Sequence, residues 1–174
     1  SRRKPMNLEK LFKIQRKLVD HIEENHPRQD GEDRLEKKIL ALQVELGELA
    51  NELPEVFKFW SNKKNNYEKA LVEFVDVLHF ILDIGLELSM DKINLYIARV
   101  QIDDDVVTLF NEIFSDASEL RFKALYSAEK HLAYESFFNT FVSLGKALGF
   151  TWEQIENAYL EKNKINHQRQ QENY

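Results

Sequence analysis

The 174 residues, 43% of them apolar and 31% charged, are enough for one domain with a buried core and too few to need two. The chain has 5 glycines and 3 prolines, whereas a protein of average composition would have roughly 21 of these residues at this length. Because turns consume glycine and proline, the deficit favours long helices joined by few loops and argues against an all-β fold. We therefore predict a single all-α domain over residues 1–174.

The charge and the residue types missing from the chain exclude several classes of function. A formal net charge of −6 argues against nucleic acid and anionic membranes as partners. With no cysteine there is no disulfide, thiolate metal site or cysteine nucleophile, as is typical of a cytoplasmic protein. Residues 1–5 are polar and basic without an apolar segment behind them, so we expect no signal peptide and interpret them as an extension or a tag. The most apolar stretch, Ala70 to Leu88, contains five ionisable residues, too many for a lipid-exposed span.

Two helices are predicted in the first third of the chain. Apolar residues recur at helical spacing after Asn7, which is a suitable N-cap, and this first helix extends to about Glu24. A second helix begins at about Asp33 and places a row of leucines, ending at Leu53, along one side. Pro54 is expected to kink or restart this helix.

The middle of the chain contains the most apolar predicted helix. Residues 57–66 form an aromatic segment followed by a polar loop. The third helix, about Tyr67 to Ser89, is apolar around most of its circumference and should therefore be central in the core. The pattern is weaker over Asp91 to Tyr126, where we predict two or three shorter helices with breaks near residues 103–105 and 115–118.

Two further helices are predicted at the C-terminal end. Ser127 is expected to cap a helix that Gly149 closes as a residue of left-handed conformation. Thr151 and Gln154 then have the spacing of a capping box, which opens a last helix from about Trp152 to Gln170. The sequence thus predicts a helical bundle of five or more helices.

Acidic residues line one side of the otherwise apolar third helix. At 3.6 residues per turn, Glu73, Asp76, Asp83 and Glu87 share a stripe about 80° wide. Carboxylates on so apolar a helix must face water, a cation or a basic side chain, because an isolated ion in an apolar environment is strongly destabilised. We expect a cation at Glu73 and Asp76, and pairing with lysine or arginine at Asp83 and Glu87.

The second helix carries a matching set of acids. Glu45, Glu48 and Glu52 fall within about 60° on the side opposite the leucines. Antiparallel helices joined by a short connection pack side by side, so Glu45 and Glu48 are expected to oppose Glu73 and Asp76 across one cleft. Four carboxylates without nitrogen or sulfur ligands favour Mg²⁺ or Mn²⁺ over zinc, and Mg²⁺ commonly shares its coordination sphere with phosphate oxygens. The pattern therefore indicates a nucleotide polyphosphate as substrate.

The last helix has a face of cations and amides. Five of its residues lie within about 120° of one another: Tyr159, Lys162, Asn163, Asn166 and Arg169. Lysine and arginine with asparagine between them suit phosphate oxygens, to which arginine can bind in bidentate fashion.

With these motifs the sequence resembles the all-α nucleoside triphosphate pyrophosphatases, which include the MazG-like enzymes and the dimeric dUTPases, and the match to the dimeric dUTPases is closer. Its basis is Glu45-Leu-Gly-Glu48 followed by Glu73-Phe-Val-Asp76. Further matching segments are Gln15 within Leu11–Gln15, Glu48–Glu52, Phe57–Ser61, Glu73–Leu82, and Tyr159–Asn163 with Asn166, Arg169 and Gln170. The similarity spans nearly the whole chain and is weakest over residues 93–125, a variable insert.

This resemblance implies hydrolysis of dUTP, and also dUDP, to dUMP by a homodimer with Mg²⁺, for which Mn²⁺ can substitute. The implied metal ligands are Glu45, Glu48, Glu73 and Asp76. Glu45 and Glu48 are the implied catalytic residues, with Glu45 the one that orients and deprotonates a water for attack on the β-phosphorus. The implied substrate-binding residues are Gln15 and Trp60 for deoxyuridine, His79 and Phe80 as walls, Lys63, and Tyr159, Lys162, Asn163, Asn166 and Arg169 of the last helix.

Two alternatives remain open at this stage. Many relatives carry Asp or Asn four residues after the glutamine of the first helix, where this chain has Val19. A pyrophosphatase for another nucleotide, such as dCTP or a modified triphosphate, is therefore the first alternative. The second is a helical protein-interaction module with a vestigial acidic cleft, for which residues 93–125 would be the natural surface.

Simpler structural interpretations exist for individual residues. Glu45, Glu48 and Glu52 alone would suit a solvated helix face, and an isolated histidine such as His79 is most often a hydrogen-bonded core residue. Trp60 on general grounds would be a core or interface residue. Gly47, which separates two of the acids, is expected to let a neighbouring helix approach closely.

Overall fold

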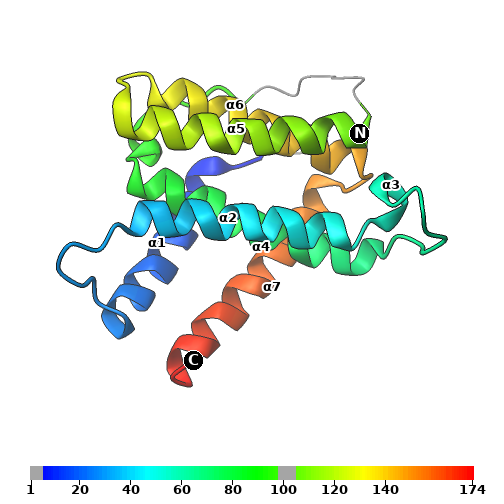
Figure 1. Cartoon of the computed structure of the whole chain (residues 1–174). Coiled ribbons are helices and arrows are strands. Elements are labelled where there is room, and N and C mark those ends of the chain that lie inside the picture. Colours follow the sequence, from blue (N-terminus) through cyan, green and yellow to red (C-terminus); the bar gives the residue numbers. More distant parts are fainter. Residues whose placement is uncertain (1–5, 98–104) are drawn as a thin grey trace.

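The computed structural model describes residues 6–97 and 105–174, and within these ranges every regular element is helical (Figure 1). The elements are α1 (Leu8–Asn25), α2 (Arg34–Asn51), α3 (Pro54–Phe57), α4 (Tyr67–Glu87), the 3₁₀ helix η1 (Met90–Lys92), α5 (Val106–Tyr126), α6 (Lys130–Ala147) and α7 (Trp152–Gln171). The predicted all-α class with five or more helices is confirmed. No helix among the described residues is both long and apolar enough to cross a membrane.

The helix α4 is the centre of the core, as its apolar sequence predicts. It packs against α1, α2 and α7, and the side chains of Phe74, Val77, Leu78 and Leu82 are completely buried. Figure 1 shows three layers, with α5 and α6 on one side of α2 and α4, and with α1 and α7 on the other. The face of α4 between α2 and α7 is therefore where side chains of three helices can meet.

Side-chain caps fix where most helices begin. Asn7, Asp33, Asn66, Asp105 and Thr151 each accept a hydrogen bond from the backbone N–H three residues later. The reciprocal bond from the Thr151 N–H to the Gln154 side chain completes the predicted capping box.

The predicted end of α6 is also confirmed. Gly149 has a φ of +83°, and the Phe150 N–H donates to the Gly145 carbonyl at 3.0 Å. This is the Schellman arrangement, in which a residue without a side chain takes the left-handed conformation. The turn sets the direction in which α7 leaves α6.

The predicted break at residues 115–118 is wrong, because α5 is one continuous helix. Ser115, Asp116 and Ser118 weaken its local helix propensity. Contacts with other parts of the fold compensate for this low propensity. The Thr140 hydroxyl of α6 donates a hydrogen bond to Asp116 at 2.6 Å. Ile113, which lies at helical spacing from other buried residues of α5, is fully buried. The other break was predicted at residues 103–105. Residues 103 and 104 lie outside the described residues, and Asp105 is the N-cap of α5.

The assignment of Ser127 as the N-cap of α6 is also wrong. Ser127 ends α5, and its hydroxyl accepts a hydrogen bond from the Glu129 N–H at 3.0 Å. The helix α6 begins at Lys130 with Glu129 as its cap. The serine therefore orders the connection between two helices, a role that local sequence does not distinguish from capping.

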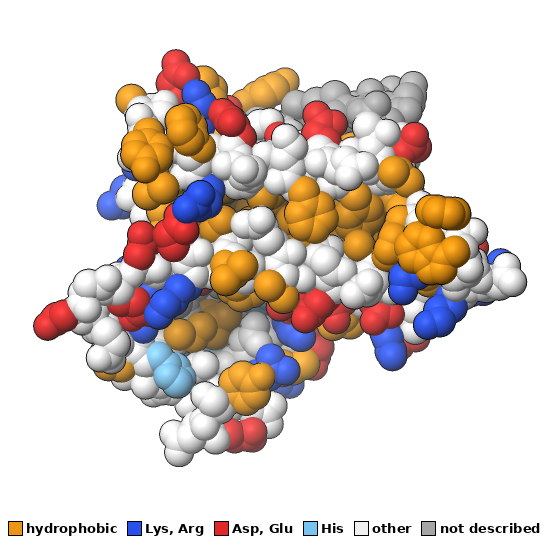
Figure 2. Space-filling view, viewed as in Figure 1, with side chains coloured by type: hydrophobic (Ala, Val, Ile, Leu, Met, Phe, Trp, Pro, Cys, Tyr) orange, Lys and Arg blue, Asp and Glu red, His pale blue; other side chains and the backbone are white. Residues whose placement is uncertain are grey.

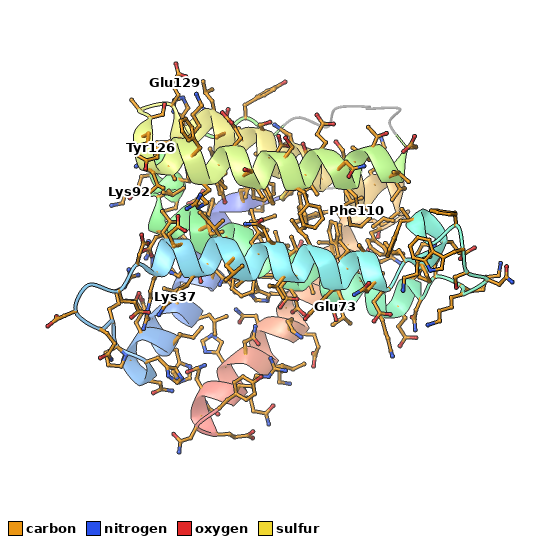
Figure 3. All side chains as sticks on the ribbon, viewed as in Figure 1. Lys37, Glu73, Lys92, Phe110, Tyr126 and Glu129 are labelled. Atoms are coloured by element: carbon orange, nitrogen blue, oxygen red, sulfur yellow. The ribbon has the colours of Figure 1, made fainter. Side chains whose placement is uncertain are left out.

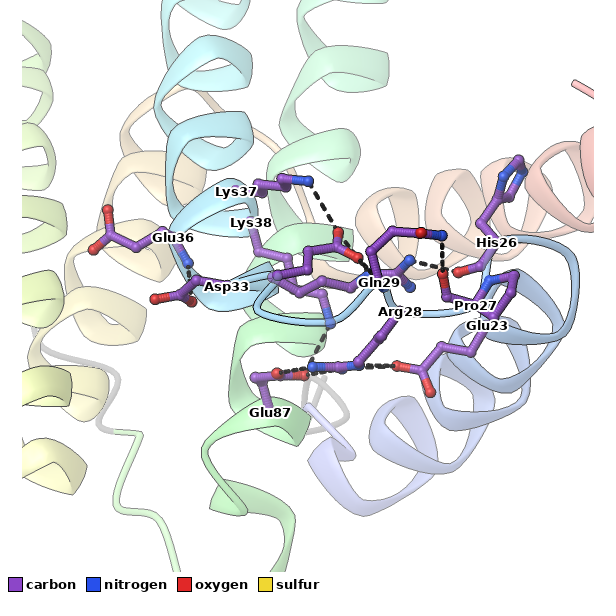
Figure 4. A network of polar contacts seen from close by, with 12 residues as sticks. Glu23, His26, Pro27, Arg28, Gln29, Asp33, Glu36, Lys37, Lys38 and Glu87 are labelled. Carbon is purple, nitrogen blue, oxygen red and sulfur yellow. Dashed lines mark hydrogen bonds and ion pairs between the residues drawn. The ribbon is translucent and has the colours of Figure 1, made fainter.

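The acids Asp83 and Glu87 at the far end of α4 pair with cations, as expected, and Figure 4 shows the contacts of Glu87. The Lys38 ammonium lies 2.8 Å from Asp83 and 3.1 Å from Glu87, and Arg28 binds Glu87 at 2.7 Å. The hydrogen bond from Arg28 holds the pKa of the Glu87 carboxyl at about 2. These two acids are thus neutralised within the chain. Of the two acids expected to bind a cation, Glu73 makes no ion pair among the described residues, whereas Asp76 pairs with Lys162 of α7 at 3.1 Å.

The expectation that Gly47 permits close helix packing is wrong, since a Cβ atom there would meet no atom of a neighbouring helix within 4 Å among the described residues. Close approaches occur instead at Gly85, against Tyr134 and Phe12, and at Gly145. A Cβ on Gly145 would lie 2.6 Å from the ring of Phe74, which is fully buried and stacked on Phe141.

Opposite effects are therefore predicted for alanine at the two glycines. Gly145→Ala overpacks the core and should lower the free energy of unfolding by about 1–3 kcal/mol. Gly47→Ala relieves the entropic disadvantage of glycine in a helix and should raise it by up to about 1 kcal/mol. Urea unfolding of both variants checks this, and a change of the same sign in both would contradict the packing described.

Candidate metal and nucleotide site

Three carboxylates meet where α2 crosses α4. Oxygen atoms of Glu45 from α2, and of Glu73 and Asp76 from α4, lie within 4.8 Å of one another. Figure 3 shows Glu73 beside α2. Glu48, one turn along α2 and exposed, is close enough to Glu45 to form a hydrogen bond that raises the pKa of Glu45. The i and i+3 spacing on each helix thus brings four acids to one place, with Glu48 at its solvent side.

The close carboxylates resist ionisation. Burial, the Glu48 hydrogen bond and the neighbouring charges raise the pKa of Glu45 to about 8. Burial and the charge of Asp76 raise that of Glu73 to about 6. One carboxylate oxygen of Glu45 and one of Glu73 are buried without a hydrogen-bond partner among the described residues. Buried oxygens of this kind are typical of places where a ligand or an ordered water binds, and an all-oxygen donor set suits Mg²⁺ or Mn²⁺.

The helix α7 supplies a positive charge to this cluster. The Lys162 ammonium lies 3.1 Å from Asp76 Oδ1, and both side chains are largely buried. Burial raises the pKa of the Asp76 carboxyl, while Lys162 and, at longer range, Arg169 oppose that rise. The cationic face predicted for the last helix therefore points toward the acids.

Next to the acids is a buried cluster of polar side chains from α1, α4 and α7. Gln15 Oε1 accepts hydrogen bonds from the Tyr159 hydroxyl at 2.8 Å and from His79 Nδ1 at 2.9 Å. The rings of His79 and Tyr159 are stacked with centroids 4.3 Å apart. Because the oxygen of Gln15 is bound twice, its amide N–H groups remain to be donated.

His79 and Asn163 each present a polar atom without a partner among the described residues. Burial lowers the pKa of His79 to about 3, so its ring is neutral. With the proton on Nδ1, the buried Nε2 atom is an acceptor, and it has no partner. Asn163, one turn along α7 from Tyr159, has an unpaired and buried Nδ2 donor. Buried polar atoms without partners are typical of places where a ligand binds.

The remaining predicted site residues lie either on the helices α4 and α7 or in the segment that joins α3 to α4. Phe80 is half-buried on α4, and Arg169 Nη1 on α7 donates to Asn166 at 3.3 Å. Trp60 is 66% exposed and packs edge-on against Phe59, with ring centroids 5.0 Å apart. Lys63 is exposed, and its N–H donates to Ser61. The described contacts of Trp60 and Lys63 thus lie within α3 and the segment that joins it to α4, outside the two polar clusters.

The contacts between these residues could not be read from the sequence. Gln15 and Tyr159, joined by a hydrogen bond, are 144 positions apart. Lys162 was expected to bind phosphate, and the sequence held no signal that it would pair with Asp76. Only the shared helix face of Tyr159, Lys162 and Asn163 indicated that these side chains act together.

The raised pKa values predict how stability depends on pH without metal. Glu45 has a pKa of about 8 in the folded protein, against an ordinary value of 4.5 expected when unfolded. Between about pH 4.5 and pH 8 the folded state therefore binds more protons than the unfolded state, so its stability falls as pH rises over this range. In EDTA, urea midpoints of the wild type should decrease between about pH 5 and pH 8, and Glu45→Gln should make this decrease less steep.

Glu52→Gln is the matched control, since Glu52 lies further along the same face and outside the cluster; it should keep the wild-type slope. Equal slopes for the wild type and Glu45→Gln would show that Glu45 does not hold a proton in this range.

Comparison with known proteins agrees with this geometry. A search of curated proteins finds no match. The family model described as dUTPase matches residues 7–174, almost the whole chain, including both pairs of acids and all of α7. The chain therefore belongs to the all-α dimeric dUTPase family and is a dUTP diphosphatase, a nucleoside triphosphate pyrophosphohydrolase.

Proposed function

We propose that the chain hydrolyses dUTP, and also dUDP, to dUMP in an Mg²⁺-dependent reaction in which a carboxylate of α2 activates the attacking water. The observation that carries this proposal is the cluster of Glu45, Glu73 and Asp76, with two buried carboxylate oxygens that have no partner among the described residues. Glu45, Glu48, Glu73 and Asp76 would hold Mg²⁺. The ion would neutralise charge on the phosphate oxygens of the substrate.

Glu45 is the proposed general base. Without metal, burial and the neighbouring acids raise the pKa of this carboxyl to about 8, so it is largely protonated at neutral pH. Bound Mg²⁺ would lower that pKa and leave a carboxylate that can accept a proton. Glu45 would take one proton from water as the water oxygen bonds to the β-phosphorus and the bridging bond to the α-phosphate breaks. dUMP then leaves with the bridging oxygen, and with dUTP the other product is pyrophosphate. Lys162, Asn166 and Arg169 would contact the phosphates and the sugar.

The buried polar atoms support recognition of uracil. Gln15 offers amide donors, His79 Nε2 is a neutral acceptor, and Asn163 offers a donor. The uracil edge has the complementary order of acceptor, donor and acceptor in O4, N3–H and O2. Cytosine presents a donor and an acceptor at the first two positions and would mismatch both. Val19 is buried and apolar, so it offers this site no polar group.

A nucleotide panel with Mg²⁺ tests this function. The wild type should release dUMP from dUTP and dUDP, with kcat/KM for dCTP at least about a hundredfold lower because two buried polar groups would be left unpaired. Glu48→Gln should lower kcat for dUTP by about a hundredfold or more, since it removes a charged group of the cluster. Glu52→Gln is the control and should leave kcat unchanged.

Different failures separate the alternatives. Equal turnover of dCTP would contradict uracil recognition and favour the broader pyrophosphatase interpretation. No turnover of any nucleotide, with Mg²⁺ or Mn²⁺, would favour an interaction module with a vestigial cleft.

We also propose a homodimer, with α2 and α5 at its interface. Leu40 and Val44 of α2 are 63% and 51% exposed, and Phe114 of α5 is 36% exposed. Figure 2 shows hydrophobic side chains along the junction of these two helices. Val44 adjoins Glu45 in the sequence, so such an interface would lie next to the acid cluster.

Light scattering checks the dimer. The wild type should have twice the chain mass of 20.6 kDa, and Val44→Glu should reduce it to one chain by placing a charge in the interface. Leu132→Glu, on α6 and as exposed as Val44, is the control and should stay dimeric. A monomeric wild type, or a Val44→Glu dimer, would contradict this interface.

A further inference from the structure

Lys162 forms an ion pair with Asp76, which is one of the proposed metal ligands. Lys162 Nζ lies 3.1 Å from Asp76 Oδ1, and the two side chains are only 16% and 15% exposed. An oxygen of Asp76 is also within 4.8 Å of oxygens of Glu45 and Glu73. The ammonium group therefore approaches the same small space into which the carboxylates converge.

Lys162 is the one cation within ion-pair distance of these acids among the described residues. The other charged group that influences Asp76 from α7, Arg169, acts at longer range. Carboxylates close together in a partly buried place require positive charge, and without a metal ion the chain provides it from Lys162. A divalent cation bound to Asp76 would lie next to the ammonium, and the two like charges would repel.

We propose that Lys162 is a built-in counter-ion of the metal-free site, which competes with the divalent cation for Asp76 and transfers to the substrate phosphates when nucleotide binds. The inference rests on the proposed function, because it takes Asp76 as a metal ligand. It adds an explanation of how metal and nucleotide binding depend on each other. Phosphate oxygens draw the ammonium away from Asp76, so nucleotide raises the affinity for the cation, and by linkage the cation raises the affinity for nucleotide.

A purely structural role for Lys162 makes a different prediction. If the ion pair only fastens α7 to α4, removal of the ammonium would loosen the site and would not raise its affinity for a cation. Competition predicts the reverse, a tighter metal site in the variant. Lys164 on the same helix allows a matched control, because it is exposed and in the described structure makes no ion pair.

The test is a titration of the full chain with Mn²⁺, with free Mn²⁺ measured by electron paramagnetic resonance. Without nucleotide, Lys162→Met should bind Mn²⁺ about tenfold more tightly than the wild type, a typical size for coupling between sites. Lys164→Met should stay within about twofold. Lys162→Gln should bind Mn²⁺ as tightly as Lys162→Met does. Circular dichroism of both variants shows whether each is folded.

The second arm adds a dUTP analogue with a non-hydrolysable imido bridge between the α- and β-phosphates. The analogue should raise the Mn²⁺ affinity of the wild type severalfold more than that of Lys162→Met. Mn²⁺ affinity that is unchanged or weaker in the folded Lys162 variants would overturn the inference, and the proposed function would stand if the wild type binds Mn²⁺. A wild type that binds no Mn²⁺, with or without the analogue, would contradict both.

Discussion

The mutual repulsion of carboxylates held together by two packed helices is the constraint on which the rest of this structure depends. Glu45 and Glu73 are brought close because α2 and α4, which carry them, pack along their apolar faces. As a result the pKa values of both carboxyls are raised, and one oxygen of each has no hydrogen-bond partner among the described residues. Core packing thus supplies the free energy that keeps these acids in a place where they are unstable alone, and a divalent cation would remove the repulsion.

The helix α7 connects this constraint to the proposed recognition of the nucleotide. One face of α7 gives Lys162 to the acids and Tyr159 to the buried amide of Gln15, so the position of a single helix sets both clusters. The capping box at Thr151 and the Schellman turn at Gly149 fix where α7 begins and how it leaves α6. Backbone geometry therefore aligns the residues proposed to contact the phosphates with those proposed to contact the base.

Much of this could be predicted from the sequence, because the relevant signals are local. The caps at Asn7 and Thr151 and the i, i+3 acids follow from helix geometry alone. The predictions were wrong at residues 115–118 and at Ser127, where contacts with another helix or turn chemistry decide the outcome. They were wrong at Gly47 because the sequence does not show which side of a helix a neighbour approaches. Pairings between distant positions, such as Lys162 with Asp76, have no local signal. Trp60 and Lys63 were assigned by resemblance, and in the structure they lie in the segment before α4.

Anomalous diffraction from crystals grown with Mn²⁺ would test most directly whether the acid cluster is a metal site. We expect an anomalous peak for a Mn²⁺ ion that is bonded to oxygens of Glu45, Glu73 and Asp76. The metal–oxygen distances should be about 2.2 Å, slightly longer than those of Mg²⁺. With a nucleotide analogue also bound, Lys162 should have left Asp76 for a phosphate oxygen. The absence of a Mn²⁺ peak between these three carboxylates, at a concentration that supports turnover of dUTP, would contradict the account.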